Sequence, residues 1–196
     1  MNTQPDTYQR ILESARDLFY ASSYADVGVA AICDKANVKK GSFYHYFPSK
    51  QDLTLAVLDT FYLEFKQSIL DKAFDNAQPP AARLEKFIEL VIEMQNQIHS
   101  QTGQVYGCPF GNLATELSTQ DETIRLKLEK LFHKLQGLIR ETLQAAVETG
   151  DIEISDPDMT AKAILAYFEG TMLLAKTNND PEILRQLLPA AGKIRI

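Results

Sequence analysis

The stretch from Lys35 to Lys50 combines residue types that suit contact with nucleic acid. It holds four lysines and no acidic residue, the lysines being Lys35, Lys39, Lys40 and Lys50. Ammonium groups bind the phosphates of a duplex, which adds affinity and positions a protein without reading base sequence. Gly41 lacks a Cβ and allows a close approach to the DNA backbone, and Ser42 offers a hydroxyl to a base edge or a phosphate. We therefore expect a DNA-contacting surface here, toward which Tyr44 and His45 project.

The net charge of −6 argues against a nucleic-acid partner if it is taken as a sum. Its distribution matters more, because a basic island in an acidic chain indicates a local DNA-binding face. The alternative is an ordinary solvated helix face, which four lysines alone would not exclude. The glycine and aromatic residues interleaved with these lysines favour DNA contact.

A second place for chemistry is Cys108, between Gly107 and Pro109. If Pro109 is the first residue of a helix, Cys108 occupies the N-cap. Free backbone N–H groups and the helix dipole would then lower the pKa of its thiol and raise its reactivity. The alternative is a small buried thiol that packs and never reacts. Cys33, on the apolar face of a predicted helix, is expected to be structural.

The chain lacks the patterns typical of enzymes. It has no glycine-rich phosphate loop, no Gly-x-Ser-x-Gly, no Cys-x-x-Cys and no Glu-x-x-His. Glu129 and His133 lie four residues apart on a predicted helix, but an isolated pair is usually a surface interaction, and His99 and His45 have no second ligand nearby. We expect no catalytic residues, no metal and no cofactor.

The length and composition fit one or two ordinary soluble globular domains. The chain has 196 residues, of which 45% are hydrophobic and 23% charged. No apolar run reaches the roughly 18 residues of a membrane span, and the first residues form no hydrophobic signal segment, so a cytoplasmic protein without membrane contact is expected. Two cysteines are too few for a disulfide framework.

Helical periodicity dominates the first part of the chain. Apolar residues from Ile11 to Phe19 share one helix face, and Asp6 is placed to cap that helix. A short helix is expected over residues 29–36, with Asn37 in the turn after it, and another over about 39–47, ended by Pro48. Ser49 can cap a fourth helix. Two short helices joined by a tight turn are the geometry that lays a recognition helix in the major groove.

The remainder is also predicted to be helical, after a break at Pro79 and Pro80. A period resumes from Leu84 to Ile98, and a glycine-rich loop then leads to a short helix that ends near Ser118. A long helix is expected from about residue 122 to 149, ended by Gly150. Asp-Pro pairs begin two more, over about 157–177 and 181–188.

The segment from Tyr24 to Lys50, YADVGVAAICDKANVKKGSFYHYFPSK, closely resembles the signature of the TetR/AcrR family of transcriptional regulators. It departs from the usual pattern at Val27 and Gly28, where threonine and serine or threonine are common, and at Asn37, which is usually glycine. Loss of the hydroxyl at Val27 or Gly28 would remove one phosphate contact or cap. The resemblance covers residues 7 to 66 strongly. It implies an all-α fold of about nine helices, with a helix-turn-helix DNA-binding domain over 1–66 (the motif over about 29–48) and a ligand-binding and dimerisation domain over 67–196.

The resemblance also implies partners and sites. The partners are a palindromic double-stranded operator, a second copy of the chain and an unidentified small-molecule effector. The expected DNA-binding residues are Gly28, Lys39, Lys40, Gly41, Ser42, Tyr44, His45, Tyr46 and Lys50. A dimer interface on the last helices would use Tyr167, Gly170, Thr171, Leu174, Leu184 and Leu187, although this face is alternatively monomer core. Aromatic residues that could line a ligand pocket, or simply form core, are Phe65, Phe74, Phe87, Tyr106, Phe110 and Phe132.

The stretch from Gly107 to Glu116, GCPFGNLATE, is similar to one in a TetR subgroup that includes sensors of electrophiles and reactive chlorine. In such sensors a lysine of the penultimate helix can support the cysteine, and Lys176 stands at a comparable place. The sequence therefore predicts a DNA-binding regulator, which the resemblance implies is a repressor. It would be released from its operator by a small-molecule ligand or by an electrophile or oxidant that acts at Cys108. The alternative is a helical ligand-binding or protein-interaction module that does not bind DNA.

Overall fold

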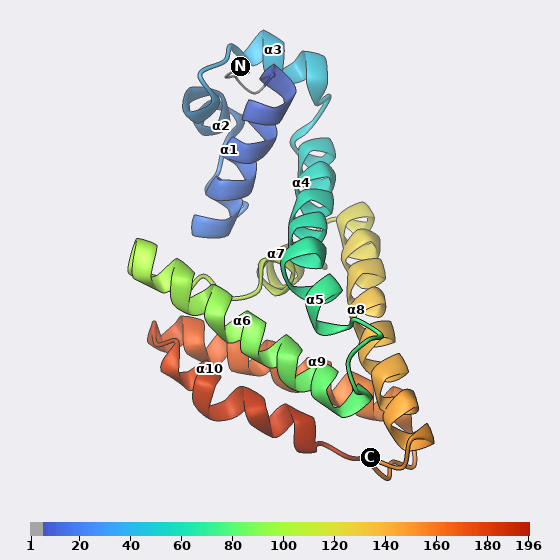
Figure 1. Cartoon of the computed structure of the whole chain (residues 1–196). Helices are drawn as coiled ribbons and strands as arrows, with labels where there is room; N and C mark the ends of the chain where they lie inside the picture. The colour runs from blue at the N-terminus through green and yellow to red at the C-terminus, as the bar shows by residue number, and fades with distance from the viewer. Residues whose placement is uncertain (1–5) are drawn as a thin grey trace. The chain divides into compact units, whose positions relative to one another are not determined.

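The computed structural model describes residues 6–196, whose regular secondary structure is helical, with no strand among them (Figure 1). The all-α prediction is confirmed. The helices are α1 (Thr7–Ala21), α2 (Val29–Ala36), α3 (Lys40–Tyr46), α4 (Lys50–Phe65), η1 (Lys66–Leu70), α5 (Asp71–Ala73), α6 (Pro80–Thr102), α7 (Pro109–Leu117), α8 (Glu122–Glu148), α9 (Pro157–Asn178), α10 (Glu182–Leu187) and η2 (Leu188–Lys193). No helix of residues 6–196 is long and apolar enough to span a membrane.

The chain divides into two compact units. Of the described residues, the first comprises 6–64 and 112–128, and the second comprises 65–111 and 129–196. The sequence suggested a single boundary at 66/67, which would leave 112–128 with the second domain. In the structure this segment groups with the first unit, which it also contacts through polar side chains: Gln51 Nε2 donates to Asp121 Oδ2 at 2.6 Å, and Lys127 pairs with Asp59.

The first unit is built on α1, which packs against α2 and α3. Asp6 Oδ1 accepts the Gln9 N–H at 2.8 Å, so the expected N-cap is present. Ile11 and Ala15 of α1 are fully buried, together with Ile32 of α2 and Phe43 of α3. Asn37 ends α2 with φ +52°, the left-handed conformation that the tight turn to α3 requires. Two short helices joined by this turn form the expected helix-turn-helix.

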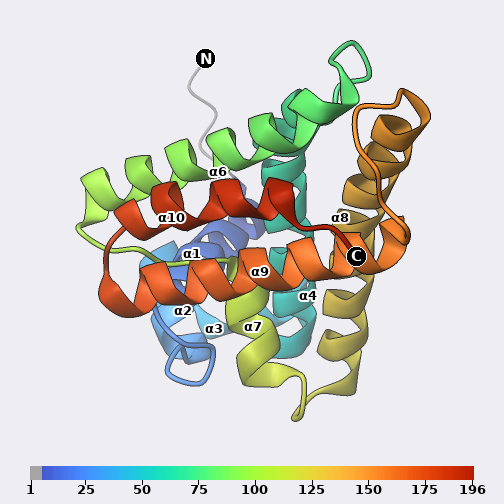
Figure 2. The ribbon, with the colours of Figure 1, turned by 90° about the horizontal axis from the view of Figure 1, so that it is seen from below.

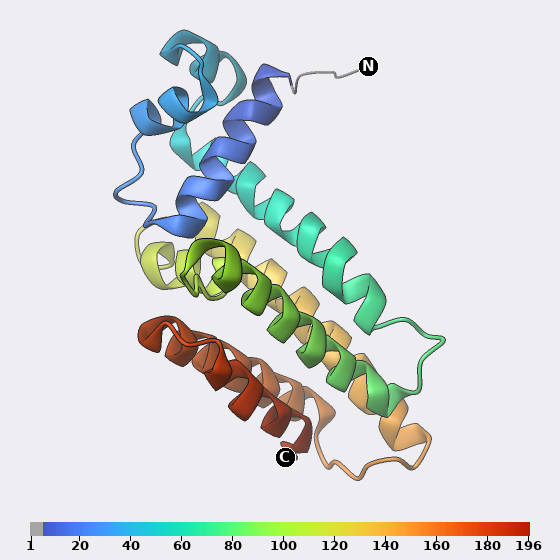
Figure 3. The same cartoon turned by 60° about the vertical axis from the view of Figure 1, so that its left-hand side comes forward.

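The second unit contains α6, α9 and α10 with η2. Asp156 Oδ1 caps α9 by accepting the N–H groups of Asp158 and Met159, and Asn179 ends that helix with φ +50°. The reversal at Asn179 brings α10 back alongside α9, as Figure 2 shows and Figure 3 repeats from another side. Leu184 and Leu188 are fully buried by this pairing.

Candidate DNA-binding surface and cysteine site

The predicted DNA-binding residues of α3 and the turn before it lie mostly at the surface of the first unit. Lys39, Lys40, Gly41 and His45 are exposed, as are Tyr44 (52%) and Tyr46 (41%), and Ser42 is half-buried. Phe43 and Phe47 point inward and are buried, with exposed fractions of 0% and 3%. The helix thus presents its polar and cationic side chains outward while its two phenylalanines anchor it.

Two glycines lie in open space on this unit. A Cβ at Gly28, the N-cap of α2, or at Gly41 would meet no atom within 4 Å. Neither glycine is therefore needed for packing. The open space around Gly41 fits the expectation that another backbone approaches it closely.

The Lys50 side chain makes its contacts within the first unit. Its ammonium donates to the Tyr24 carbonyl, lies 3.7 Å from the centroid of the Tyr24 ring and lies 5.7 Å from that of Phe19. Burial lowers the pKa of Lys50, and the charge of Glu116 opposes that shift. The expected phosphate contact of Lys50 stays a prediction; within the chain, the Tyr24 carbonyl and ring already supply an acceptor and an aromatic face to this cation.

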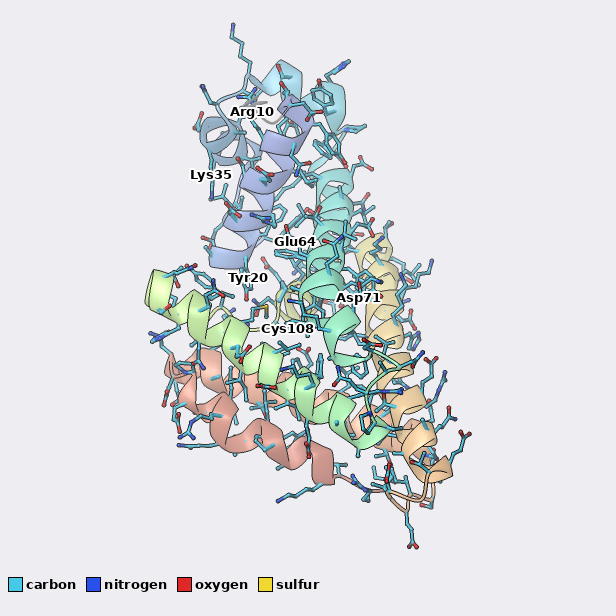
Figure 4. The ribbon with its side chains drawn as sticks, viewed as in Figure 1. Arg10, Tyr20, Lys35, Glu64, Asp71 and Cys108 are labelled. Atoms are coloured by element: carbon cyan, nitrogen blue, oxygen red, sulfur yellow. The ribbon has the colours of Figure 1, made fainter. Side chains whose placement is uncertain are left out.

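Two further residues position the helix-turn-helix and were missed from the sequence. Arg10 of α1 donates to the Ala36 carbonyl at 3.1 Å, satisfying the C-terminal end of α2; Figure 4 labels Arg10 on α1. Glu116 of α7 accepts the N–H of Tyr24 at 2.9 Å and that of Ala25 at 2.7 Å, one with each carboxylate oxygen. These partners are distant in sequence, so local spacing gave no signal for them.

Cys108 occupies the predicted N-cap position of α7 in the second unit, where Figure 4 labels it. The Gly111 N–H donates to its Sγ at 3.4 Å. However, the side chain is only 8% exposed, and burial raises the pKa of its thiol well above the usual range, with the charge of Glu169 as the next cause. The expectation of a lowered pKa is wrong, because desolvation and a neighbouring carboxylate outweigh the helix terminus.

The neighbour of Cys108 is Glu169 of α9, which the sequence interpretation did not single out. The Cys108 thiol and the Glu169 carboxylate are hydrogen-bonded, and burial raises the pKa of Glu169. Lys176, the expected neighbour, lies about two turns further along α9 and is exposed. In the sequence, the feature that could have pointed to Glu169 is its position as a carboxylate on an otherwise apolar face of the predicted helix.

The loop that carries Cys108 is fixed from both sides. Gln95, fully buried on α6, donates through Nε2 to the Gly107 carbonyl at 3.3 Å. Asn179 accepts the Val105 N–H at 2.8 Å and donates to the Gly103 carbonyl at 2.9 Å. Cys108 is therefore held in place before any reaction.

The predicted ligand-pocket aromatics gather only in part. Ring contacts join Phe65 to Phe87 and to Phe110, and Phe87 to Phe74 and to Phe168, with centroids 5.5 to 6.3 Å apart. Phe87 and Phe110 are buried, and Tyr106 and Phe132 are half-buried. These rings form a packed cluster, and Phe110 in the first turn of α7, close to Cys108 in the chain, is one of its members.

A cavity of about 680 Å³ lies elsewhere in the second unit, along α6, the end of α8, and α10 with η2. Its apolar lining includes Leu84, Ile88 and Leu143, and its charged lining comes from glutamates of α6 and from Arg185, Lys193 and Arg195. None of the predicted ligand residues lines it. Separately, no cluster of metal-ligating side chains is found within residues 6–196.

The predicted dimer residues divide into two groups. Thr171 and Leu184 are buried within the chain, and Tyr167 donates its hydroxyl to the Leu187 carbonyl at 3.0 Å. Gly170 and Leu174 are exposed, and the neighbouring Leu173 is 63% exposed. The apolar surface of α9 that is open to a partner is thus centred on residues 170–174.

Comparisons with known proteins agree with this architecture. Residues 11–57 match the family described as bacterial regulatory proteins, tetR family, and residues 80–191 match the tetracyclin repressor-like C-terminal domain. An HTH-type transcriptional regulator from the lacX 3′ region of Lactococcus lactis subsp. lactis is 34% identical over 179 residues, which is 91% of this chain and 88% of that protein.

Two crystal structures are similar over nearly the whole chain. The regulatory protein TetR from Rhodobacter sphaeroides has a TM-score of 0.82 and 30% identity, covering 97% of this chain and 99% of that one. The reduced form of Escherichia coli NemR, an HTH-type transcriptional repressor, has a TM-score of 0.78 and 25% identity, covering 97% and 98%.

Proposed function

Because this chain belongs to the tetR family of bacterial regulatory proteins, we propose that it represses transcription and leaves its operator when Cys108 reacts with an electrophile or an oxidant. The chain is a helix-turn-helix DNA-binding transcription regulator, and the alternative of a module without DNA binding is set aside. Repression is supported by NemR, which is named a repressor. A bacterial regulator meets DNA in the cytoplasm, and we place it there.

The observation that carries the sensing proposal is the position of Cys108. It is fixed at the start of α7, hydrogen-bonded to the Gly111 N–H and to Glu169. The similar NemR structure is specified as a reduced form. Any group added to Sγ enlarges a side chain that is 92% covered, so the first turn of α7 has to move.

The same helix carries the residue that holds the helix-turn-helix loop. Glu116, in the last turn of α7, accepts the N–H groups of Tyr24 and Ala25 just before α2. We infer that a displacement at the start of this nine-residue helix shifts its last turn as well, because backbone hydrogen bonds connect successive turns. We propose that modification of Cys108 weakens DNA binding by disturbing this contact of Glu116.

We assign DNA contact to the exposed residues of the first unit, and effector response and dimerisation to the second. The DNA-contacting set is Gly28, Lys39, Lys40, Gly41, Ser42, Tyr44, His45 and Tyr46. Dimerisation through Gly170, Leu173 and Leu174 would supply two recognition helices for a palindromic operator, whose half-sites lie about 34 Å apart.

The cavity of about 680 Å³ supports a second route of regulation. Its combination of apolar and charged lining residues suits a small amphipathic molecule bound without covalent chemistry. Such a ligand would act by binding better to the form with low DNA affinity.

The test is a titration of a fluorescent duplex from the DNA upstream of this protein's own gene, at several salt concentrations. Treatment with methylglyoxal or a quinone should abolish binding by the natural chain and leave Cys108→Ser bound. Binding that resists the electrophile sinks the sensing proposal and directs attention to the cavity. Failure to bind promoter DNA at any salt concentration contradicts the regulator function itself.

A further inference from the structure

The proposed sensing role of Cys108 raises a chemical difficulty. The nucleophile in thiol chemistry is the thiolate, and burial raises the pKa of this thiol. At neutral pH Cys108 is therefore a neutral S–H group. A reaction with an electrophile requires a base that removes the proton as the sulfur attacks.

The structure provides one base in contact with the thiol. Glu169 projects from α9 so that its carboxylate fills the space left by the absent side chain of Gly111. A Cβ at Gly111 would overlap Glu169 Oε2 and lie 3.5 Å from the Cys108 Cβ. Cys108, Gly111 and Glu169 thus meet at one point, and the glycine is required for the carboxylate to reach the thiol.

The surroundings suit a proton transfer inside this pair. Moving the proton from sulfur to carboxylate leaves the buried charge at −1, so it creates no new charge in the low-dielectric interior. The Gly111 N–H, 3.4 Å from Sγ, strengthens as a hydrogen bond once the sulfur is anionic. Glu169 Oε1 is buried and has no hydrogen-bond partner among residues 6–196.

We propose that Glu169 is the general base for Cys108, and that the reaction it serves is addition of small uncharged electrophiles such as α,β-unsaturated carbonyl compounds. The S–H bond breaks and its proton passes to a Glu169 oxygen, while the sulfur electron pair forms a bond to the β-carbon. The C=C π pair becomes an enolate, which is protonated at the α-carbon by Glu169. The carboxylate is regenerated, and the net change is addition of S–H across the double bond.

The uncharged class follows from the electrostatics of the site. When Glu169 is ionised the pair carries one negative charge, which repels an anionic reagent, and Phe110 beside it is buried and apolar. This inference rests on the proposed sensing function, and its test has to separate the two.

The experiment measures the rate of N-ethylmaleimide addition to Cys108 by peptide mass spectrometry, between pH 5 and 10, in the full chain. In the natural protein the rate should rise as Glu169 ionises and then reach a plateau. Glu169→Gln keeps the shape and a hydrogen-bond acceptor but takes no proton, so the plateau should vanish. The rate at pH 7 should fall about 100-fold, the lower end of what a positioned base contributes.

A second variant leaves both reacting groups in the chain. Gly111→Ala displaces the Glu169 carboxylate and should slow the reaction to a similar extent, whereas Gly137→Ala, whose Cβ meets nothing within 4 Å, should react at the natural rate. Circular dichroism and DNA binding before treatment establish that each variant is folded.

The outcomes are distinct. Glu169→Gln or Gly111→Ala reacting at the natural rate or faster would overturn the role of Glu169, because the carboxylate would then be idle or a brake on thiolate formation. DNA release, followed in the same samples by fluorescence anisotropy, tests the sensing function independently. If Cys108 is alkylated without loss of DNA, the sensing proposal fails, whatever the rate in Glu169→Gln.

Discussion

At the level of the single residue, two lysines of the basic stretch lie in different surroundings. Lys40 is exposed at the start of α3, whereas Lys50 donates to the Tyr24 carbonyl and lies over the Tyr24 ring. A cation that already has an acceptor and a ring would lose both by turning to a phosphate. We therefore propose that Lys40 contacts DNA and Lys50 maintains the fold.

Lys40→Gln and Lys50→Gln should separate these roles. Loss of one phosphate contact reduces the slope of log affinity against log salt by about 0.9, which we expect for Lys40→Gln with an unchanged free energy of unfolding. Lys50→Gln should keep the slope and lower the free energy of unfolding by about 1.5–3 kcal/mol, the usual contribution of a hydrogen bond to a charged group. Salt-dependent anisotropy titrations and urea unfolding measure the two quantities. A reduced slope for Lys50→Gln would reverse the assignment.

Glu169 should also make the stability of the chain depend on pH. Burial raises the pKa of its folded state above that of the unfolded chain, against the opposing hydrogen bond from Cys108. The stabilisation by neutral Glu169 is complete below the unfolded pKa and is lost as pH rises through the folded pKa. Relative to Glu169→Gln, the free energy of unfolding of the natural chain should fall between pH 4 and pH 8. The decrease should be about 1.4 kcal/mol for each unit by which folding raises the pKa of Glu169. Urea unfolding of both proteins across this range measures the difference, and a constant difference would show that Glu169 is solvated.

At the level of the element, α7 is short but has a defined contact at each end. Its start is the N-cap Cys108, and its last turn holds Glu116, which accepts two backbone N–H groups of the loop between α1 and α2. This loop precedes α2, so the carboxylate helps fix where the helix-turn-helix begins. The chain also passes from the second unit to the first within α7, after Gly111.

Glu116→Gln should weaken DNA binding through this loop. The glutamine amide keeps one oxygen that can accept a backbone N–H, but its NH₂ group faces the other backbone N–H. One of the two hydrogen bonds is therefore lost, and two donors face each other. We expect a loss of about 1–3 kcal/mol in unfolding free energy and a lower affinity for the operator. Glu148→Gln, an exposed position at the end of α8, is the matched control and should change neither. Natural affinity in Glu116→Gln would argue that the loop is held by other contacts.

At the level of the whole molecule, regulation of a palindromic operator requires two copies of the chain. The exposed apolar residues Leu173 and Leu174 lie on α9 beside Gly170, which permits a close helix approach. Unpartnered leucines on one helix face are the kind of surface that a second copy buries.

Leu173→Glu should convert the proposed dimer to monomers. A charge buried in an apolar interface is uncompensated, so association should weaken by several kcal/mol while each chain stays folded. Sedimentation velocity gives the mass, and the control Leu63→Glu alters a leucine of α4 that is 53% exposed, compared with 63% for Leu173. A natural chain that sediments as a monomer, or a Leu173→Glu chain that remains dimeric, contradicts this interface.

The local features of the fold could be predicted from the sequence. The caps at Asp6 and Asp156, the turn at Asn37 and the buried faces of the short helices all depend on residues within a few positions of one another. The chemistry of these features is set by neighbours in the chain, so periodicity and turn preferences were sufficient. The exposed cations and glycine of α3 follow from the same local pattern.

Long-range partners were decided only by the tertiary structure. The sequence placed Cys108 at a helix start and inferred an acidic thiol, but packing brought Glu169 from α9 against it and removed solvent, and both effects raise its pKa. In the same way Lys50 meets Tyr24, and Glu116 meets the loop before α2. The position of a residue in a helix is a local property, whereas its charge state and its function depend on which distant groups share its surroundings.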